Sequence, residues 1–329
     1  MKKTGLLLFL MVAIAASAQQ AENSASASAP STTPAGTLAT NASFPIERIQ
    51  TPTNADLYCA GFINKQLLPN ANFVGGGLQS PSSTKYANGD ILYLYGRGYQ
   101  TGQQYTIVRE LRDPNRYESY TGQHAAIRAA GQPYSEVGRI RIIDTRHKMA
   151  IAQIEFSCDT VVPGDIAVPF VEKPAISFHP PTRFDVFVPP TGKLSGRILM
   201  GKDFDSVLGT GMKVYINIGS NQGVKVGDYF RAVRSYTADL QDPVDSLSFR
   251  ASTADDSQAH PPSIQPNLLT DNKGPKIYVQ DMPRRAVGEI VVIGVTPTTA
   301  TGMIVYALED VHVGDAVEVD EQNAQAQLQ

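Results

Sequence analysis

An internal repeat constrains this chain more than any other feature of its sequence. Residues 137–143 (VGRIRII) align with residues 287–293 (VGEIVVI), and the spacing of 150 residues continues without a gap to the Gly-Asp pairs at 164–165 and 314–315. Upstream, four residues recur at a spacing of 125: Gly98, Gly102, Val108 and Arg109 match Gly223, Gly227, Val233 and Arg234. The chain therefore carries two copies of one module, and its fold must suit both.

The repeated segments have the pattern of β-strands. Alternate residues from Ala150 to Phe156 are apolar and share one face, and residues 300–306 do the same. Residues 287–295 are nearly all apolar, as in a strand that is buried on both faces. The 27 Gly and 22 Pro among 329 residues demand many turns and disfavour long helices. We expect an all-β, mainly antiparallel fold of two small barrel-like modules in tandem, preceded by a disordered tether.

Gly-Asp pairs recur at 89–90, 164–165, 227–228 and 314–315, each before an apolar strand. At such positions glycine supplies an unusual backbone angle, and aspartate accepts a hydrogen bond within its own turn. The alternative is a set of carboxylate metal ligands, which is the less favoured interpretation. Arg109 and Arg234 occupy equivalent positions in the two copies. We expect each to form an internal ion pair in its barrel rather than to bind an anion.

The difference between the two spacings locates an insertion. The second copy carries 25 more residues between Arg234 and Val287, in a polar, proline-rich stretch. We interpret residues 237–285 as a long exposed loop, whereas the first copy has a shorter one at 113–135. The domain boundaries are then residues 56–170 for β module 1, 171–191 for a Pro-rich connector, 192–319 for β module 2 and 320–329 for a disordered tail.

The N-terminus has the parts of a secretory signal peptide. A positively charged start and an apolar stretch at residues 6–16 precede a small-x-small cleavage motif that ends at Ala18. The stretch is shorter than the ~20 residues that span a bilayer. We assign residues 1–18 to the signal peptide and residues 19–55, rich in Ala, Ser, Thr and Pro, to a disordered tether. The mature protein is expected in the periplasm or outside the cell, with no transmembrane segment.

Motifs for catalysis and cofactor binding are not found in this sequence. Its five histidines lack the spacing of a zinc site, and no phosphate or dinucleotide loop has the required glycines. A net charge of −3 gives no basic surface for nucleic acid. We therefore expect no catalytic residue, metal, cofactor or nucleic-acid partner. An envelope hydrolase that uses aspartates is the least favoured function.

Cys59 and Cys158 are the two cysteines of the chain, and both lie in the first copy. In an exported protein a disulfide between them is favoured. Two separate buried thiols are the alternative, because a free cysteine packs as a small hydrophobic side chain. Ser195 and Leu308 are taken as the equivalent positions of the second copy, so the module itself does not require the bond.

Tyrosines are the residues in this chain that could carry recognition. Tyr93, Tyr95 and Tyr99 cluster in the first copy, where exposed rings could stack on a sugar or on a partner protein. Half-buried packing between strands is the alternative. Arg284 and Arg285 end the long loop of the second copy and complete the candidate binding surface, because loops on a rigid scaffold are where binding usually diverges. An insertion that is tolerated without a role is the equal alternative for this loop.

Part of the second copy resembles a known module. Residues 214–230 (VYINIGSNQGVKVGDYF), together with 287–290 and 313–317, resemble the C-terminal β domain of the flagellar assembly protein T. Similar modules occur in exported bacterial envelope proteins that carry a LysM domain. The resemblance covers residues 192–319 and, more weakly, the first copy. It implies a periplasmic β module of a ring-building protein, without enzymatic activity. The tandem duplication departs from that family, as does the lack of its α/β domains and of a LysM-like segment.

These observations lead to two expectations about function. The first is an exported, non-enzymatic cell-envelope protein that serves as a scaffold or binds another envelope protein. The alternative is a module that binds peptidoglycan or another glycan through its tyrosines. A pull-down with purified cell wall distinguishes them, because only the second binds when no other protein is present.

Overall fold

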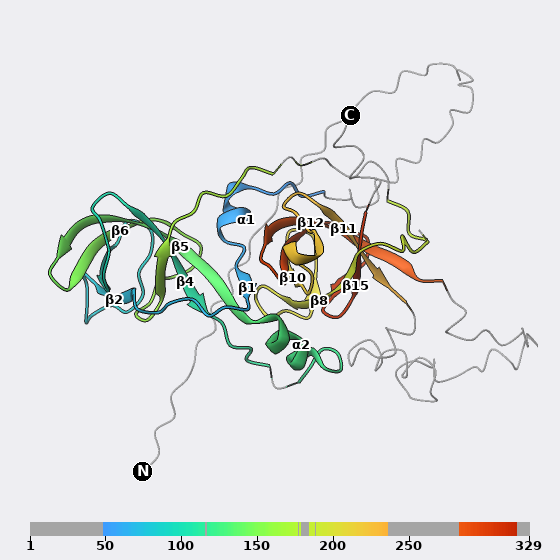
Figure 1. Cartoon of the computed structure of the whole chain (residues 1–329), viewed down its shortest axis with the longest axis horizontal. Coiled ribbons are helices and arrows are strands. Elements are labelled where there is room, and N and C mark those ends of the chain that lie inside the picture. The colour runs from blue at the N-terminus through green and yellow to red at the C-terminus, as the bar shows by residue number, and fades with distance from the viewer. Residues whose placement is uncertain are drawn as a thin grey trace, which may run out of the picture. The chain divides into compact units, whose positions relative to one another are not determined.

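The computed structural model describes residues 49–115, 117–176, 178, 184–187, 189–235 and 283–320. They form two closed, six-stranded antiparallel β-barrels, which confirms the all-β tandem fold (Figure 1). We call the barrel of residues 73–169 barrel 1 and that of residues 195–319 barrel 2. Both belong to one compact unit. The predicted signal peptide, most of the tether, the long loop up to residue 282 and residues 321–329 lie outside the described residues.

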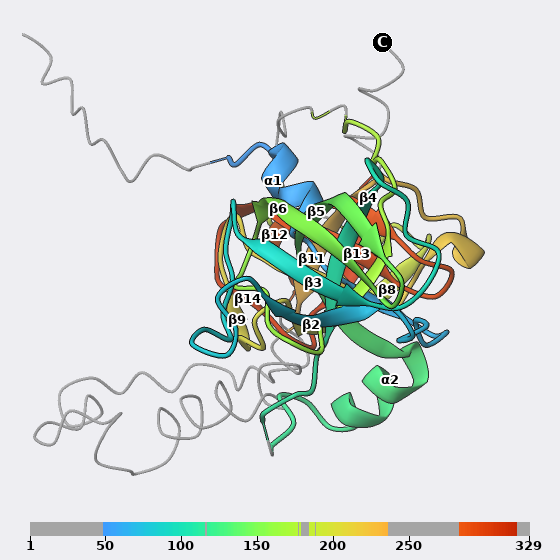
Figure 2. The same cartoon turned by 90° about the vertical axis from the view of Figure 1, so that its left-hand side faces the viewer.

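Barrel 1 is built from six strands: β2 (Phe73–Gly77), β3 (Ile91–Tyr95), β4 (Gln104–Glu110), β5 (Gln132–Arg146), β6 (Met149–Ser157) and β7 (Ile166–Pro169). They follow the order β5-β4-β7-β2-β3-β6, and β6 pairs with β5 to close the ring. The short β1 (Phe62–Asn64) pairs with the first residues of β5. Figure 2 shows this barrel nearest the viewer.

Barrel 2 repeats this topology with β8 (Ser195–Gly201), β10 (Lys213–Ile216), β11 (Tyr229–Arg234), β12 (Arg285–Val295), β13 (Ala300–Ala307) and β15 (Ala316–Val319). Its cyclic order is β10-β13-β12-β11-β15-β8. The six strands of each barrel can be matched in chain order, so that β2 corresponds to β8 and β7 to β15. With this match, the two barrels have the same cyclic order of strands. The short pair β9 (Val207–Leu208) and β14 (Val311–His312) matches an isolated bridge between Tyr86 and Val161 in barrel 1.

Even the irregularities of the strands are repeated. The β4–β5 register shifts between Ile107 and Val108, and the β11–β12 register shifts 125 residues later, between Ala232 and Val233. A second shift, after Arg139, returns after Glu289. Because a bulge re-aims every side chain that follows it, shared bulges place equivalent residues on equivalent faces. The sequence repeat is therefore a repeat of one barrel.

All four Gly-Asp pairs form the same turn. The glycines have positive φ angles, between 89° at Gly89 and 104° at Gly314. In each pair the aspartate carboxylate accepts a hydrogen bond from the N–H three residues earlier, at 2.9 Å from Ala87 to Asp90 and at 2.7 Å from His312 to Asp315. The aspartates are thus turn residues, as the sequence indicated.

Two of these aspartates also hold the repeated arginines. Arg109 donates from Nε and Nη2 to the two oxygens of Asp165, both at 2.8 Å. Arg234 forms the same two bonds with Asp315, at 2.9 and 2.7 Å. Each arginine also donates from Nη2 to a backbone carbonyl in the preceding turn, that of Thr160 or Asp310. The predicted internal ion pairs are confirmed, with the bidentate geometry that suits guanidinium and carboxylate.

Side chains fill the inside of both barrels. Leu92, Ile140 and Ile154 belong to the buried cluster of barrel 1, and Phe230 and Ile290 to that of barrel 2. Even an eight-stranded barrel is only wide enough for its own side chains or one small ligand, so a six-stranded one has less room. Contact with any partner therefore falls on the outside.

Two boundaries and one predicted equivalence differ from the structure. Helix α1 (Asn54–Tyr58) begins at residues assigned to the tether, because Thr53 and Asp56 form a capping box. Asp320, assigned to the tail, is folded and bonds to Arg231 at 2.6 Å. Ser195 begins β8, the counterpart of β2, so it is not the equivalent of Cys59, which lies before β1.

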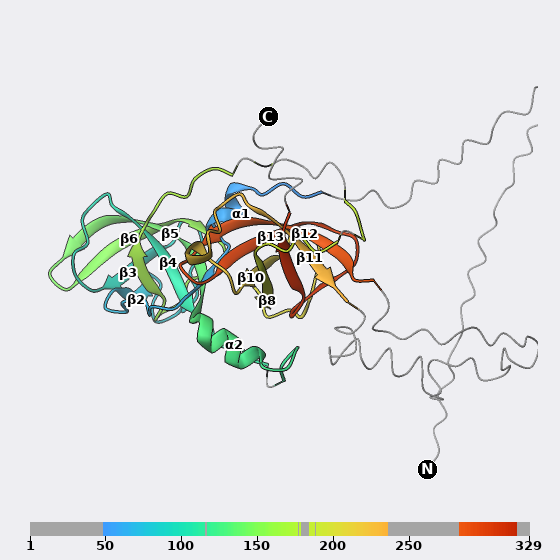
Figure 3. The ribbon, with the colours of Figure 1, turned by 45° about the vertical axis from the view of Figure 1, so that its right-hand side comes forward.

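The shorter predicted loop, residues 113–135, contains a helix that the sequence did not indicate. Helix α2 (Gln123–Ala130) buries Ile127 and Ala130 against Leu199 and Tyr215 of barrel 2. On barrel 2, α1 packs instead on the outer face of β12 and β13, through Leu57. Figures 1 and 3 show the two helices against different sides of that barrel. Within the described ranges, neither these helices nor any other is long and apolar enough to cross a membrane.

Buried hydrogen bonds join the segment before barrel 1 to barrel 2. The hydroxyl of Tyr215 donates to the carbonyl of Ala60 at 3.0 Å, and that of Thr301 to the carbonyl of Gly61 at 3.0 Å. Thr299 donates in the same way to Ile63, at 2.9 Å. The chain between α1 and β1 is thus held by both barrels, and it fixes α1 beside the outer face of barrel 1.

Candidate functional site: a pocket between α1 and barrel 1

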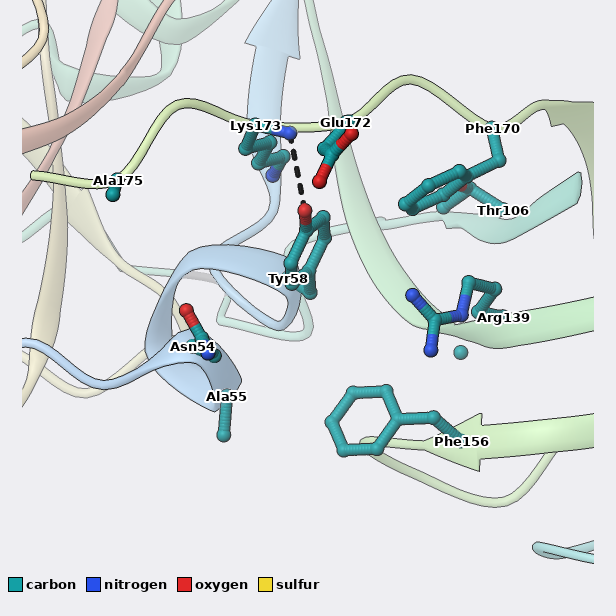
Figure 4. Close-up of a pocket in the computed structure, with 11 residues that line it drawn as sticks. Asn54, Ala55, Tyr58, Thr106, Arg139, Phe156, Phe170, Glu172, Lys173 and Ala175 are labelled. Carbon is teal, nitrogen blue, oxygen red and sulfur yellow. Dashed lines mark hydrogen bonds between the residues drawn. The ribbon is translucent and has the colours of Figure 1, made fainter. Parts of the chain in front are cut away.

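A pocket of about 430 Å³ lies where α1 meets the outer face of barrel 1 (Figure 4). Its walls come from five places in the chain: α1, β4, β5, β6 and the segment that follows β7. The disulfide between Cys59 and Cys158 ties two of these places together, since it joins the residue after α1 to the residue after β6. The favoured pairing of the two cysteines is confirmed.

Aromatic rings line much of this pocket. Tyr58 is the last residue of α1, Phe156 lies on β6 and Phe170 follows β7. The rings of Tyr58 and Phe170 are 5.6 Å apart between centroids. All three side chains are half-buried, so each presents part of its ring to the pocket. Such rings provide a large contact area with little loss of side-chain entropy on binding.

Arg139, on β5, brings a positive charge to the pocket. Its guanidinium carbon lies 5.1 Å from the centroid of the Phe170 ring, within the range of a cation–π contact. Its Nε forms an ion pair with Glu155 at 3.4 Å, and this nitrogen makes no hydrogen bond with a described residue. In Figure 4 the guanidinium lies across the pocket from Tyr58, with one terminal nitrogen on the side of Tyr58 and the other on the side of Phe156. Arg139 therefore has donors left for a ligand.

Glu155 is engaged by two other side chains. Gln104 donates to its Oε2 at 2.6 Å, and Arg141 donates to its Oε1. Burial alone would raise the pKa of Glu155, but these hydrogen bonds outweigh it, and the pKa lies below its ordinary value. The carboxylate stays ionised and steadies Arg139 without using up its hydrogen-bonding capacity.

Lys173 holds the back of the pocket in place. Its Nζ donates to both oxygens of the buried Glu136, at 2.6 and 2.8 Å, and to the carbonyl of Leu57 at 2.7 Å. Its backbone N–H donates to the Tyr58 hydroxyl at 3.1 Å, the bond drawn in Figure 4. Because this ammonium group is already bonded to Glu136 and Leu57, Arg139 is the cation in the pocket lining that can bind a ligand.

The tyrosines singled out from the sequence lie elsewhere on barrel 1. Tyr95 is exposed and its ring stacks on that of Phe73, with the centroids 5.7 Å apart. Tyr99 packs edge-on against Tyr105 and donates to the carbonyl of Tyr95 at 3.1 Å. Burial, and then the neighbouring Tyr105, raise the pKa of Tyr99. Tyr93 is half-buried on β3.

Arg284 and Arg285 belong to barrel 2. Arg284 donates to both oxygens of Glu318, and this hydrogen bonding lowers the pKa of that carboxylate. Arg285 donates from Nε to both oxygens of Glu309 at 2.9 Å. The structure therefore does not bring these arginines together with the three tyrosines, which are on the other barrel, and the five residues do not form one surface.

The residues of the pocket were missed because each has an ordinary local pattern. A signal was nevertheless present in the repeat. Arg139 aligns with Glu289, and Phe170 with Asp320, although their neighbours match closely between the copies. Positions that change in chemical character within an otherwise similar repeat indicate that the two copies have diverged there.

Comparison with known proteins assigns no function to this pocket. No family model matches the chain, and no curated protein matches it. Within the described ranges, no group of three or more His, Cys, Asp or Glu side chains is placed to hold a metal ion.

Proposed function

We propose that this is an exported, non-enzymatic protein of the cell envelope, whose pocket beside α1 binds another envelope protein. The pocket carries the proposal: it is concave, lined by three aromatic rings, and contains an arginine with unused donors. Aromatic residues and arginine are the residue types that contribute most to protein–protein binding. The leader and the resemblance to the β domain of the flagellar assembly protein T support the envelope part of the proposal.

The way the barrels are joined supports a scaffold. Buried hydroxyls of barrel 2 bind the backbone of residues 60–63, and the disulfide ties that same segment to barrel 1. A partner bound at the pocket would contact α1, which both barrels hold. Little conformational entropy is then lost on binding, which favours affinity.

Photo-crosslinking in cells tests the proposal. A photoreactive residue at Ala55, an exposed position in the pocket wall, is expected to trap a protein of the envelope. The matched control is Tyr117, which is 88% exposed and lies outside the pocket lining, and we expect no such adduct there. Absence of any protein adduct at Ala55 contradicts the proposal. So does a purified native protein that retains Met1 and fractionates with the cytoplasm.

Binding to peptidoglycan is the second candidate, and the same aromatic rings favour it, because they could stack on sugars. Purified cell wall, freed of other proteins, separates the two. Retention of the protein by cell wall, reduced by Tyr58→Ala and Phe156→Ala, would replace protein binding with glycan binding as the function of this pocket.

A further inference from the structure

Barrel 2 has residues equivalent to four that line the pocket, and another segment of the chain covers them. The repeat places Thr106, Arg139, Phe156 and Phe170 opposite Arg231, Glu289, Tyr306 and Asp320. Their cross-strand pairing agrees with this match, since Thr106 faces Arg139 as Arg231 faces Glu289. The two sets of residues therefore mark the same place on the outside of each barrel.

The occupant of barrel 2 is the chain's own connector. The ring of Phe184 packs edge-on against Tyr306, with centroids 4.9 Å apart, and the Arg231 guanidinium carbon lies 5.8 Å from the Phe184 centroid. The carbonyl of Val186 accepts a hydrogen bond from the N–H of Ala286, on β12, at 2.8 Å. An aromatic side chain and a backbone hydrogen bond thus hold this segment on the barrel.

The charges at this place are arranged differently in the two barrels. In barrel 2 the arginine is Arg231, at the position of Thr106, and it donates to Asp320 at 2.6 Å, with both side chains buried. In barrel 1 the position of Asp320 is taken by Phe170, and Arg139 has an ion pair with Glu155 at 3.4 Å but no hydrogen bond from Nε to a described residue. A segment that fits there can offer a carboxylate to the terminal nitrogens of Arg139, which the ion pair of its Nε with Glu155 leaves without a hydrogen bond among the described residues.

We infer that the pocket of barrel 1 binds a peptide segment of a partner protein that inserts an aromatic side chain next to an acidic one. The aromatic ring would lie against Phe156 and Tyr58, as Phe184 lies against Tyr306, and the carboxylate would accept hydrogen bonds from Arg139. The connector has this chemistry itself, since Asp185 follows Phe184. The inference rests on the proposed function and specifies the chemistry of its partner.

A labelled peptide with the sequence of residues 182–189 (TRFDVFVP) is the probe. We expect the full-length mature protein to bind it saturably in a fluorescence anisotropy titration. Arg139→Ala should weaken binding at least about tenfold, the effect of losing a hydrogen bond to a charged group. Ala55→Trp, which fills the pocket from its exposed wall, should abolish it. Arg146→Ala, on the same strand and paired with Asp144, should leave binding unchanged.

Changes in the peptide provide matched controls. Replacing the phenylalanine at position 184 by alanine, or the aspartate at 185 by asparagine, should weaken binding. Replacing the phenylalanine at 187, which is 65% exposed in the structure, should not. Binding that survives Ala55→Trp would overturn the inference, because the peptide would then be exchanging with the connector on barrel 2. Absence of saturable binding to the unaltered protein would also overturn it, while a protein adduct at Ala55 would still support the proposed function.

Discussion

At the scale of single residues, the path of the chain between the barrels depends on glycine conformation and on buried polar contacts. Gly61 shows this most clearly. Its φ angle is +71°, and a Cβ at that position would lie 2.5 Å from the Tyr215 hydroxyl oxygen and 2.6 Å from the carbonyl oxygen of Tyr134. The chain passes here between the two barrels, so glycine is required both for its backbone angle and for its lack of a side chain.

Gly61→Ala is therefore expected to destabilise the protein by more than the strain of a positive φ alone. That strain costs about 1–2 kcal/mol, and the clash adds the loss of the bonds that Tyr215 and Thr301 make to residues 60 and 61. Urea unfolding measures the difference. Gly89→Ala is the control, since Gly89 has a φ angle of +89° but no atom near its Cβ position. Equal losses of unfolding free energy in both variants would contradict the prediction.

At the scale of elements, the two barrels differ in what covers their outer faces. Val291, Met303 and Val305 of barrel 2 are buried beneath α1 and the connector. The positions that match them in barrel 1 are Arg141, Gln153 and Glu155, which are polar and meet solvent. This explains why residues 287–295 are nearly all apolar, as predicted for a strand buried on both faces, whereas β5 alternates.

The contact between Asp56 of α1 and Lys213 of β10 should make stability depend on pH. Burial acts to raise the pKa of Asp56, but hydrogen bonds from Lys213 and Thr53 outweigh it, and the pKa is lowered in the folded state. Because the pKa of Asp56 is lower in the folded state, its ionised carboxylate adds to the unfolding free energy at pH values above its ordinary pKa of 3.8. This stabilisation is lost as the pH falls through the pKa of the folded state.

We therefore expect Asp56→Asn to reduce the unfolding free energy at pH 7 and to have less effect as the pH falls below 3.8. Denaturant unfolding of both proteins across this range measures the difference. A difference between them that stays constant down to pH 2 would contradict the assignment.

The disulfide should stabilise α1 and the pocket together. It closes a loop of 99 residues, for which loop-closure entropy predicts at most about 4.7 kcal/mol of unfolding free energy. We expect Cys59→Ser with Cys158→Ser to lower the unfolding free energy by a large part of this amount and to weaken peptide binding at the pocket. Thiol labelling of denatured, unreduced protein should find no free thiol. Two labelled cysteines in the unaltered protein would contradict the bond.

At the scale of the whole molecule, side-chain hydroxyls of barrel 2 are among the contacts that join the two barrels. Thr299 and Thr301 are buried and satisfy carbonyls of Ile63 and Gly61. Removal of a hydroxyl leaves a buried carbonyl without its donor, at a cost of about 1–3 kcal/mol each. Folding of the two barrels is coupled through these bonds and through the packing of α1 and α2.

We predict that the unaltered protein unfolds in one calorimetric transition, and that Thr299→Val with Thr301→Val separates it into two. The reason is that valine preserves the shape of threonine but removes the bond between the barrels. Thr298→Val is the control, because Thr298 is half-buried and its bond to the Ala130 carbonyl is longer, at 3.3 Å. One unchanged transition in the double variant would contradict the prediction, because the remaining contacts, among them the bond from Tyr215 to Ala60, would then suffice to couple the barrels.

The sequence alone determined the strands, the turns and the duplication, because these depend on patterns that lie close together or recur at a fixed spacing. It also indicated the Arg109 and Arg234 ion pairs, since both partners lie at repeated positions. It did not indicate helix α2, the fold of residues 54–64, or the pocket. These depend on contacts such as those of Tyr215 with Ala60 and Thr301 with Gly61, whose partners are 155 and 240 residues apart. Which element covers an outer face is set by such distant packing, and no local pattern encodes it. Only the tertiary structure therefore placed Tyr58 beside Phe170 and left Arg139 with donors to spare.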